Sequence, residues 1–176
     1  MQSIQTVSEN TIYVGASDRR LAKFENLFPI PRGVSYNAYV ILDEKTALLD
    51  TADASVGAQF LENVAAALDG RKLDYLIVDH MEPDHAAMIE AVLVRWPDLR
   101  LVVNAKTLPM LKMYFPTDSA AIDYALVVKE GDTLDLGKHK LTFVMAPMVH
   151  WPEVMMTFDT TTGTLFSADA FGTFGA

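Results

Sequence analysis

The chain contains no cysteine among its 176 residues, which excludes disulfide bonds and thiolate metal ligands. Any metal bound by this chain must therefore be held mainly by histidine nitrogen and carboxylate oxygen. No apolar run reaches the roughly 18 residues that a membrane-spanning helix needs. The first residues also lack the basic and apolar regions of a secretory signal. We therefore expect a cytoplasmic protein without a membrane partner.

Positive charge is scarce as well. The 14 lysines and arginines are outnumbered by 23 aspartates and glutamates, giving a formal net charge of −9 and a pI of about 4.7. Proteins that bind nucleic acid usually carry a basic patch, so this composition argues against a nucleic-acid partner. Hydrophobic residues make up 51% of the chain, as in an ordinary folded domain with a sizeable core.

The periodicity of apolar residues predicts a mixture of strands and helices. Strands are expected at residues 12–14, 35–42, 46–50, 73–78, 101–103, 133–136, 140–146, 154–158 and 164–167. Helices are expected at residues 56–68, 86–96 and 107–114. Strands come first, then strands alternating with helices, then strands again, an order that favours an α+β fold with helices covering sheets. No repeat, low-complexity tract or interdomain linker is visible.

The strongest motif is the segment from His80 to His85, directly after the predicted strand 73–78. It holds two imidazoles and two carboxylates, His80, His85, Glu82 and Asp84. α/β folds place ligands outside the carboxyl ends of their strands, which is where this segment lies. Pro83 fixes its own φ and stiffens the loop, and Asp84 also suits the N-cap of the following helix.

A structural alternative exists for each of these residues. A lone His-X-Glu is usually a solvated loop, and Asp84 alone is better explained as a helix cap. However, apolar runs bracket the segment on both sides, so the four titratable groups should be partly buried. Burial costs several kcal/mol for each uncompensated charge. A bound cation would remove that cost, and the cluster therefore favours a metal site.

Two further residues repeat the pattern of His80. His150 follows the predicted strand 140–146, and Asp169 follows the strand 164–167. Alone, His150 could be a core histidine and Asp169 a turn residue; three strand ends presenting ligands at one sheet edge would form a site. By contrast, His139 lies in a polar turn, and we expect it to be exposed and uninvolved.

Three other residues lie near the ligands in sequence. Trp151, Met81 and Phe171 could line a pocket or belong to the core, and the sequence does not choose between these alternatives.

The series His80-X-Glu82-X-Asp84-His85, followed by His150 and Asp169, resembles the metallo-β-lactamase-like domain of flavodiiron proteins. These A-type flavoproteins reduce oxygen to water or nitric oxide to nitrous oxide. The resemblance covers the whole chain and includes residues 32–37, 79–86, 150–152 and 166–169. It implies a metallo-β-lactamase-like αββα sandwich that is incomplete at its C-terminal side.

The resemblance also implies a ligand set. His80, Glu82 and His150 would hold one iron, Asp84 and His85 the other, and Asp169 would bridge the pair, together with an oxo or hydroxo group. Hydrolytic relatives of this fold carry histidine where this chain has Glu82. A carboxylate makes the site harder and more anionic, which suits iron better than zinc. Electrons would come from a donor such as rubredoxin or a flavoprotein.

In two respects the chain departs from the family pattern. A seventh ligand, a histidine, is expected beyond Asp169, and the flavodoxin-like domain that binds FMN is absent. We therefore expect residues 1–176 to form a partial di-metal domain with an under-coordinated second metal and no FMN of its own. In the full-length family, a head-to-tail homodimer brings the FMN of one protomer to the irons of the other.

Two other functions remain open. The fold also allows a binuclear metallohydrolase, in which metal-bound hydroxide attacks a carbonyl or phosphoryl centre, although Glu82 argues against it. The third alternative is a truncated, non-catalytic domain. The sequence does not distinguish oxygen from nitric oxide as the substrate.

Overall fold

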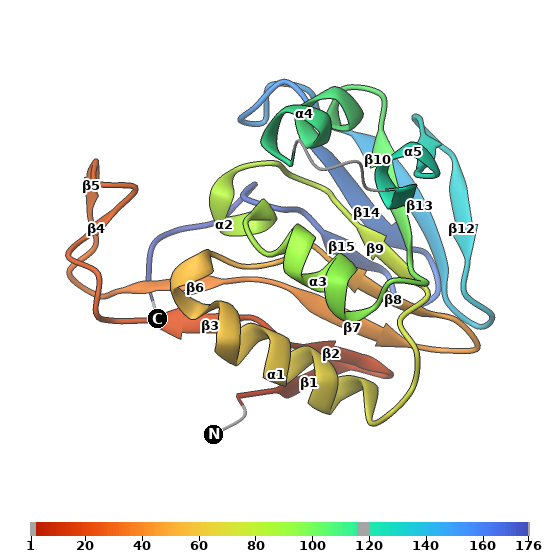
Figure 1. Ribbon diagram of the computed structural model, residues 1–176, viewed down its shortest axis with the longest axis horizontal. Coiled ribbons are helices and arrows are strands. Elements are labelled where there is room, and N and C mark those ends of the chain that lie inside the picture. The colour runs from red at the N-terminus through yellow and green to blue at the C-terminus, as the bar shows by residue number, and fades with distance from the viewer. Residues whose placement is uncertain (1–2, 116–119, 176) are drawn as a thin grey trace.

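Two β-sheets and a layer of helices make up the computed structural model (Figure 1). It describes residues 3–115 and 120–175. Met1, Gln2 and Ala176, which belong to the terminal segments considered above, lie outside the described residues. The helices cover one face of a seven-stranded sheet, and a four-stranded sheet packs on the other face. The described helices include none that is long and apolar enough to cross a membrane.

The seven-stranded sheet has an antiparallel half and a parallel half. Its strands, in spatial order, are β1 (Gln5–Ser8), β2 (Thr11–Tyr13), β7 (Tyr39–Leu42), β8 (Thr46–Leu49), β9 (Tyr75–Ile77), β10 (Arg100–Asn104) and β11 (Leu126–Val128). The pairs from β8 to β11 are parallel. Parallel neighbours need crossover connections, and the helices between these strands provide them. The carboxyl ends of β8 and β9 consequently lie side by side.

The second sheet is antiparallel throughout. It consists of β12 (Thr133–Asp135), β13 (Lys140–Met145), β14 (Met155–Asp159) and β15 (Thr164–Phe166). Two small ribbons complete the β structure: β3 (Ala16–Asp18) with β6 (Val34–Tyr36), and β4 (Lys23–Phe24) with β5 (Phe28–Pro29). The predicted strand 35–42 is therefore two strands, β6 and β7, which belong to different sheets.

The helices are short apart from α1. They are the 3₁₀ turn η1 (Ala54–Val56) and the helices α1 (Gly57–Leu68), α2 (Pro83–Ala86), α3 (Ile89–Arg95), α4 (Thr107–Tyr114) and α5 (Ala120–Asp123). The single helix predicted over 86–96 is wrong in extent. Pro83 begins α2 three residues earlier, and the chain leaves the helix at Met88, whose N–H is 3.3 Å from Thr51 Oγ1. Glu82 occupies the N-cap position and Asp84 lies in the first turn, so the N-cap expected at Asp84 is wrong too.

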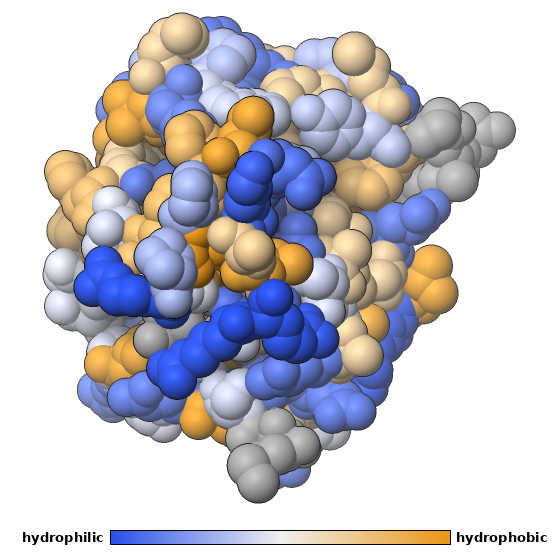
Figure 2. All heavy atoms as spheres, turned by 90° about the vertical axis from the view of Figure 1, so that its left-hand side faces the viewer, coloured by the Kyte–Doolittle hydropathy of each residue, from blue (hydrophilic) through white to orange (hydrophobic). Residues whose placement is uncertain are grey.

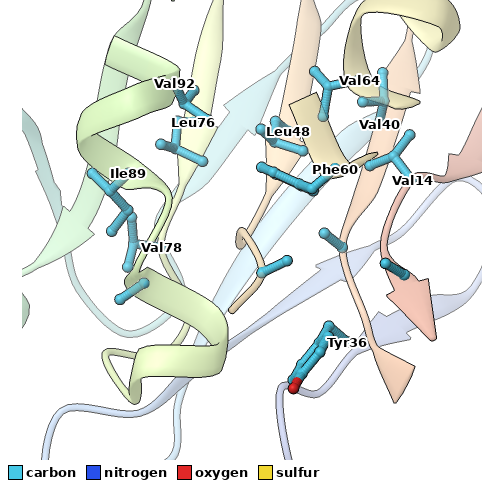
Figure 3. Packing of buried hydrophobic residues seen from close by; sticks show 14 of the residues in the cluster. Val14, Tyr36, Val40, Leu48, Phe60, Val64, Leu76, Val78, Ile89 and Val92 are labelled. Atoms are coloured by element: carbon cyan, nitrogen blue, oxygen red, sulfur yellow. The ribbon is translucent and has the colours of Figure 1, made fainter. Parts of the chain in front are cut away.

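Two apolar layers hold the sheets and helices together. Phe60 from α1 and Val92 from α3 pack on the seven-stranded sheet at Leu48 and Leu76 (Figure 3). On the other face of this sheet, a second cluster joins it to the four-stranded sheet, and Phe143 is buried there. Each fully buried side chain of this size contributes about 1.5–3 kcal/mol. The strand ends that carry the polar residues described below are therefore fixed by a packed core.

Asn63 on α1 is a buried polar side chain that ties this helix to the chain between β2 and β3. Its Nδ2 donates to the backbone oxygens of Val14 and Gly15, at 3.2 and 2.8 Å. Asn63→Ala would leave both buried carbonyls without this donor, at a cost of about 1–3 kcal/mol. We expect urea denaturation to show that loss. Glu62→Ala, at the exposed neighbouring position, is the control. An equal loss of unfolding free energy in this variant would show that the Asn63 bonds contribute nothing.

Candidate metal centre

The predicted site residues come from three separate segments that meet at one edge of the two sheets. The segment 80–85 follows β9, His150 lies in the connection between β13 and β14, and Asp169 lies just after β15. The first segment belongs to the seven-stranded sheet and the other two to the four-stranded sheet. The structure brings all six predicted residues together.

Four of the six residues form the first group. One nitrogen or oxygen from each of His80, Glu82, His150 and Asp169 lies within 4.8 Å of every other. The Nε2 atom of His80 is 3.1 Å from Glu82 Oε2, and that of His150 is 2.8 Å from the same oxygen. Asp169 Oδ2 is 3.2 Å from His150 Nε2. The two imidazoles therefore turn the same ring nitrogen towards the two carboxylates.

The second group shares one residue with the first. Asp84, His85 and Asp169 also place one candidate ligand atom each within 4.8 Å of the others. His85 Nε2 lies 2.8 Å from Asp169 Oδ1 and 3.8 Å from Asp84 Oδ2. Asp169 thus presents one carboxylate oxygen to each group, an arrangement that suits a carboxylate bridging two cations.

The pKa values of the titratable groups in this cluster are strongly shifted by burial and by their neighbours. Burial raises the pKa of Asp84 to about 6, and the neighbouring carboxylates of Asp169 and Glu82 add to the rise. Burial opposes protonation of His85, but hydrogen bonds to Asp169 and Asp50 raise its pKa well above the ordinary value. The pKa of Asp169 is lowered in spite of its burial, because His85 donates to it. Imidazoles and carboxylates in this cluster therefore stabilise each other's charged forms.

Two observations show that this donor set fits a pair of metal ions. Asp84 Oδ1 is buried and has no hydrogen-bond partner, a costly state that a coordinated cation would relieve. The donors are imidazole nitrogens and carboxylate oxygens, which are suitable ligands for divalent iron, zinc or manganese. No thiolate is available to select a softer metal.

Two carboxylates that the sequence analysis missed stand behind these imidazoles. Glu153 Oε1 is 2.8 Å from His80 Nδ1, and Asp50 Oδ2 is 2.9 Å from His85 Nδ1. A signal for Asp50 existed, since it directly follows the apolar strand β8, as polar residues follow other strands at this edge. Glu153 lies inside the connection between β13 and β14, and no pattern distinguished it.

A cleft of about 400 Å³ opens above the candidate ligands. Its lining combines Glu82, Asp84, His150 and Asp169 with the aromatic rings of Phe24, Phe28 and Phe174. Figure 2 shows the face towards the β4–β5 hairpin, on which hydrophobic and strongly hydrophilic side chains lie next to one another. The cleft therefore has an apolar wall on one side and charged candidate ligands on the other.

The sequence left open whether Met81, Phe171 and Trp151 line a pocket or belong to the core, and the structure places them differently. Met81 is buried in the core at 0% exposure, whereas Phe171 is 91% exposed and lines a separate cavity of about 420 Å³ near β15. The Trp151 ring stands edge-on to the His80 imidazole, with centroids 5.4 Å apart. Trp151 thus packs against a candidate ligand.

The exposure expected for His139 is wrong. The residue is 1% exposed, because the turn that carries it packs against the β7–β8 and β14–β15 turns. Its Nδ1 lies 2.8 Å from Asp159 Oδ2, and its N–H donates to Asp43. The polar neighbours Lys138 and Lys140 concealed a residue that packs inward. Asp159, at the opposite end of β14 from the candidate metal centre, is its partner.

Comparison with known proteins gives a consistent result. A family model described as "ODP family beta lactamase" matches residues 34–176. The putative diflavin flavoprotein A 1 of Thermosynechococcus vestitus is 38% identical over 94% of this chain and 28% of its own length. The anaerobic nitric oxide reductase flavorubredoxin of Klebsiella pneumoniae is 37% identical over 94% of this chain and 34% of its own.

Solved structures agree with the sequence relatives. The rubredoxin oxygen:oxidoreductase of Desulfovibrio gigas superposes with a TM-score of 0.92 at 32% identity, over 99% of this chain and 43% of that one. The flavodiiron protein of Giardia intestinalis gives a TM-score of 0.90 at 27% identity, over 100% of this chain and 42% of that one. The predicted metallo-β-lactamase-like fold is confirmed, and the chain spans less than half the length of these relatives.

Proposed function

Because the chain belongs to the ODP family of beta-lactamase domains, the form found in flavodiiron proteins, we propose that it is the di-iron half of an oxygen or nitric oxide reductase. The single observation that carries the proposal is the pair of ligand groups sharing Asp169. Relatives named as a nitric oxide reductase and as an oxygen oxidoreductase support the same chemistry.

The candidate ligands divide naturally between two ions. His80, Glu82 and His150 would hold one, Asp84 and His85 the other, and Asp169 would contact both. Two bound ferrous ions would supply two electrons, enough to reduce two nitric oxide molecules to nitrous oxide, or half of the four that oxygen needs to become water. Glu82, where a hydrolytic site would carry imidazole, adds negative charge and a hard oxygen donor, which favours iron over zinc.

The residues around the ligands define how such a molecule would reach them. The cleft is lined by Phe24, Phe28 and Phe174 on one side and by the ligands on the other. Apolar walls suit a small uncharged molecule better than a polar ester or amide. Because the described residues offer the second metal three ligands, Asp84, His85 and Asp169, an open coordination position is expected there.

Continued turnover requires electrons from outside this chain. The proposal assigns them to an FMN-binding domain in the full-length protein and to a donor such as rubredoxin, as the names of the relatives suggest. A head-to-tail dimer in the full-length protein is part of the same proposal.

Metal analysis and a single-turnover reaction test the function. After anaerobic reconstitution with ferrous iron, we expect about two irons per chain by elemental analysis. Mixing this form with nitric oxide should oxidise both irons, followed by visible absorbance, and yield one nitrous oxide and one water from two nitric oxide molecules. Reduction of one oxygen molecule to water takes four electrons, so it should consume the ferrous iron of two chains. A chain that instead binds two zincs and hydrolyses a lactam or ester, without oxidising ferrous iron, would contradict the proposal.

A further inference from the structure

Two buried carboxylates lie behind the candidate ligands, one for each metal position. Glu153 is 1% exposed and contacts His80, and Asp50 is 4% exposed and contacts His85. A carboxylate only accepts hydrogen bonds, so each contacted Nδ1 must carry the hydrogen. When the ring is neutral, as an imidazole that binds a metal must be, the lone pair is on the other nitrogen, Nε2, which faces the ligand cluster.

We infer that Asp50 and Glu153 are positioning residues that fix which ring nitrogen His85 and His80 present to the two metals. The inference rests on the proposed function only in that it requires two metal ions. Such carboxylate partners orient imidazole ligands and raise their basicity. His150 provides the contrast: its side chain is 56% exposed, and among the described residues its hydrogen bonds involve Nε2 alone.

The two carboxylates use their oxygens differently. Glu153 accepts from His80 Nδ1 and from the Met81 N–H through the same atom, Oε1, at 2.8 and 3.0 Å. Its other oxygen, Oε2, is buried and has no hydrogen-bond partner. A glutamine at position 153 could therefore keep both bonds with its amide oxygen and place its NH₂ group where Oε2 lies. Only the negative charge would be lost.

Asp50 has no spare oxygen. Its Oδ2 accepts from His85 Nδ1, while its Oδ1 accepts from the N–H groups of Asp79 and His80, at 2.7 and 3.4 Å. An asparagine at position 50 must turn its NH₂ group towards one of these donors. If it faces His85, the ring must accept at Nδ1 and carry its hydrogen on Nε2, which no longer binds a metal. If it faces Asp79 instead, a buried N–H loses its acceptor.

The backbone tolerates this substitution. Asp50 has a φ of 54°, in the left-handed region that asparagine adopts as readily as aspartate. Asp50→Asn therefore changes the hydrogen-bond pattern without straining the main chain. Asp50→Ala would remove the hydrogen bonds to Asp79, His80 and His85 together, so it does not isolate the effect on the His85 ring.

A third aspartate provides a matched control. Asp159 also accepts from an imidazole, His139 Nδ1, through Oδ2 at 2.8 Å, and from the Thr161 N–H through Oδ1 at 3.0 Å. It is fully buried, like Asp50, but lies at the far end of β14 from the candidate metal centre. Asp159→Asn should alter thermal stability while leaving metal affinity unchanged.

The test is titration of each 176-residue variant with Co²⁺ and Zn²⁺ against a competing chelator. We expect Asp50→Asn to weaken binding at one of the two positions by about 10–100-fold, and Glu153→Gln to stay within about fivefold of the wild type. Glu153→Ala, which loses both hydrogen bonds, should weaken binding by about 10–100-fold, so that Glu153→Gln amounts to rescue. In the zinc-loaded wild type, ¹⁵N NMR should show protonated Nδ1 on His80 and His85.

The outcomes separate this inference from the proposed function. If Asp50→Asn and Glu153→Ala bind both ions as tightly as wild type, the positioning role is wrong while the di-metal proposal stands. If Glu153→Gln is as weak as Glu153→Ala, the charge and not the geometry matters, which also overturns the inference. A wild type that binds neither ion would overturn both. Should Asp50→Asn fail to fold, the Glu153→Ala and Glu153→Gln comparison decides alone.

Discussion

Replacement of Asp169 by alanine is expected to abolish binding of both metals at once. Asp169 is the only residue common to the two ligand groups: Oδ1 lies 2.8 Å from His85 Nε2 and Oδ2 lies 3.2 Å from His150 Nε2. Losing a partner behind a ligand weakens metal affinity by about 10–100-fold, and losing a ligand shared by two ions should cost each of them more than that. Elemental analysis should find the iron content falling from about two per chain to near zero.

A loss confined to Asp169 must be distinguished from general damage. Asp135→Ala removes an exposed carboxylate on β12, and this variant should keep both irons. The Asp169→Ala chain should fold, because its carboxylate is partly exposed and lies in a segment after the last strand. One iron retained at wild-type affinity would show that Asp169 serves a single ion, and the bridging role would then be wrong.

Removal of the metals is expected to lower the melting temperature by about 10 °C or more. A ligand present at a thousand times its Kd stabilises the folded state by about 4 kcal/mol. For a chain of this length, each kcal/mol corresponds to about 2–4 °C in Tm. The cation would also relieve Asp84, whose Oδ1 is buried without a partner. Differential scanning calorimetry before and after treatment with a chelator measures the shift.

The Asp169→Ala variant again supplies the control. Because it should bind neither ion, a chelator should leave its melting temperature unchanged, and that temperature should resemble the metal-free wild type. Equal melting temperatures for the loaded and metal-free wild type would mean that the ions bind weakly or bind the unfolded chain equally well. Either result would contradict a pre-formed metal centre.

Much of the candidate centre could be predicted because its residues obey one simple rule. His80, His150 and Asp169 each follow an apolar strand, and strands of packed sheets end at common edges. Asp50 obeys the same rule after β8, but the sequence does not mark it as a site residue, because no histidine or second candidate ligand lies next to it. Glu153 obeys no such rule: its role comes from a loop conformation that brings it under His80, which only the tertiary structure reveals.

Other differences have local physical causes. The helix predicted over 86–96 is interrupted because a tertiary contact with Thr51 competes with helical hydrogen bonding at Met88. The predicted strand 35–42 is divided because its two halves pair with different partners, β3 and β2. His139 shows that a polar turn is not always exposed, since a second turn can fold over it. The periodicity of a sequence reflects the polarity of neighbouring residues. It carries no information about packing against segments that are distant in the sequence.

The absence of cysteine leaves this chain with no disulfide to cross-link its two sheets. The candidate ligands would join the sheets through the metals instead. The segment 80–85 extends from the seven-stranded sheet, while His150 and Asp169 extend from the four-stranded one. Two bound ions would therefore act as a removable cross-link that closes loops between distant parts of the chain. We expect a newly made chain to be open to proteases along this seam until iron arrives. Iron supply would then set the lifetime of the folded chain.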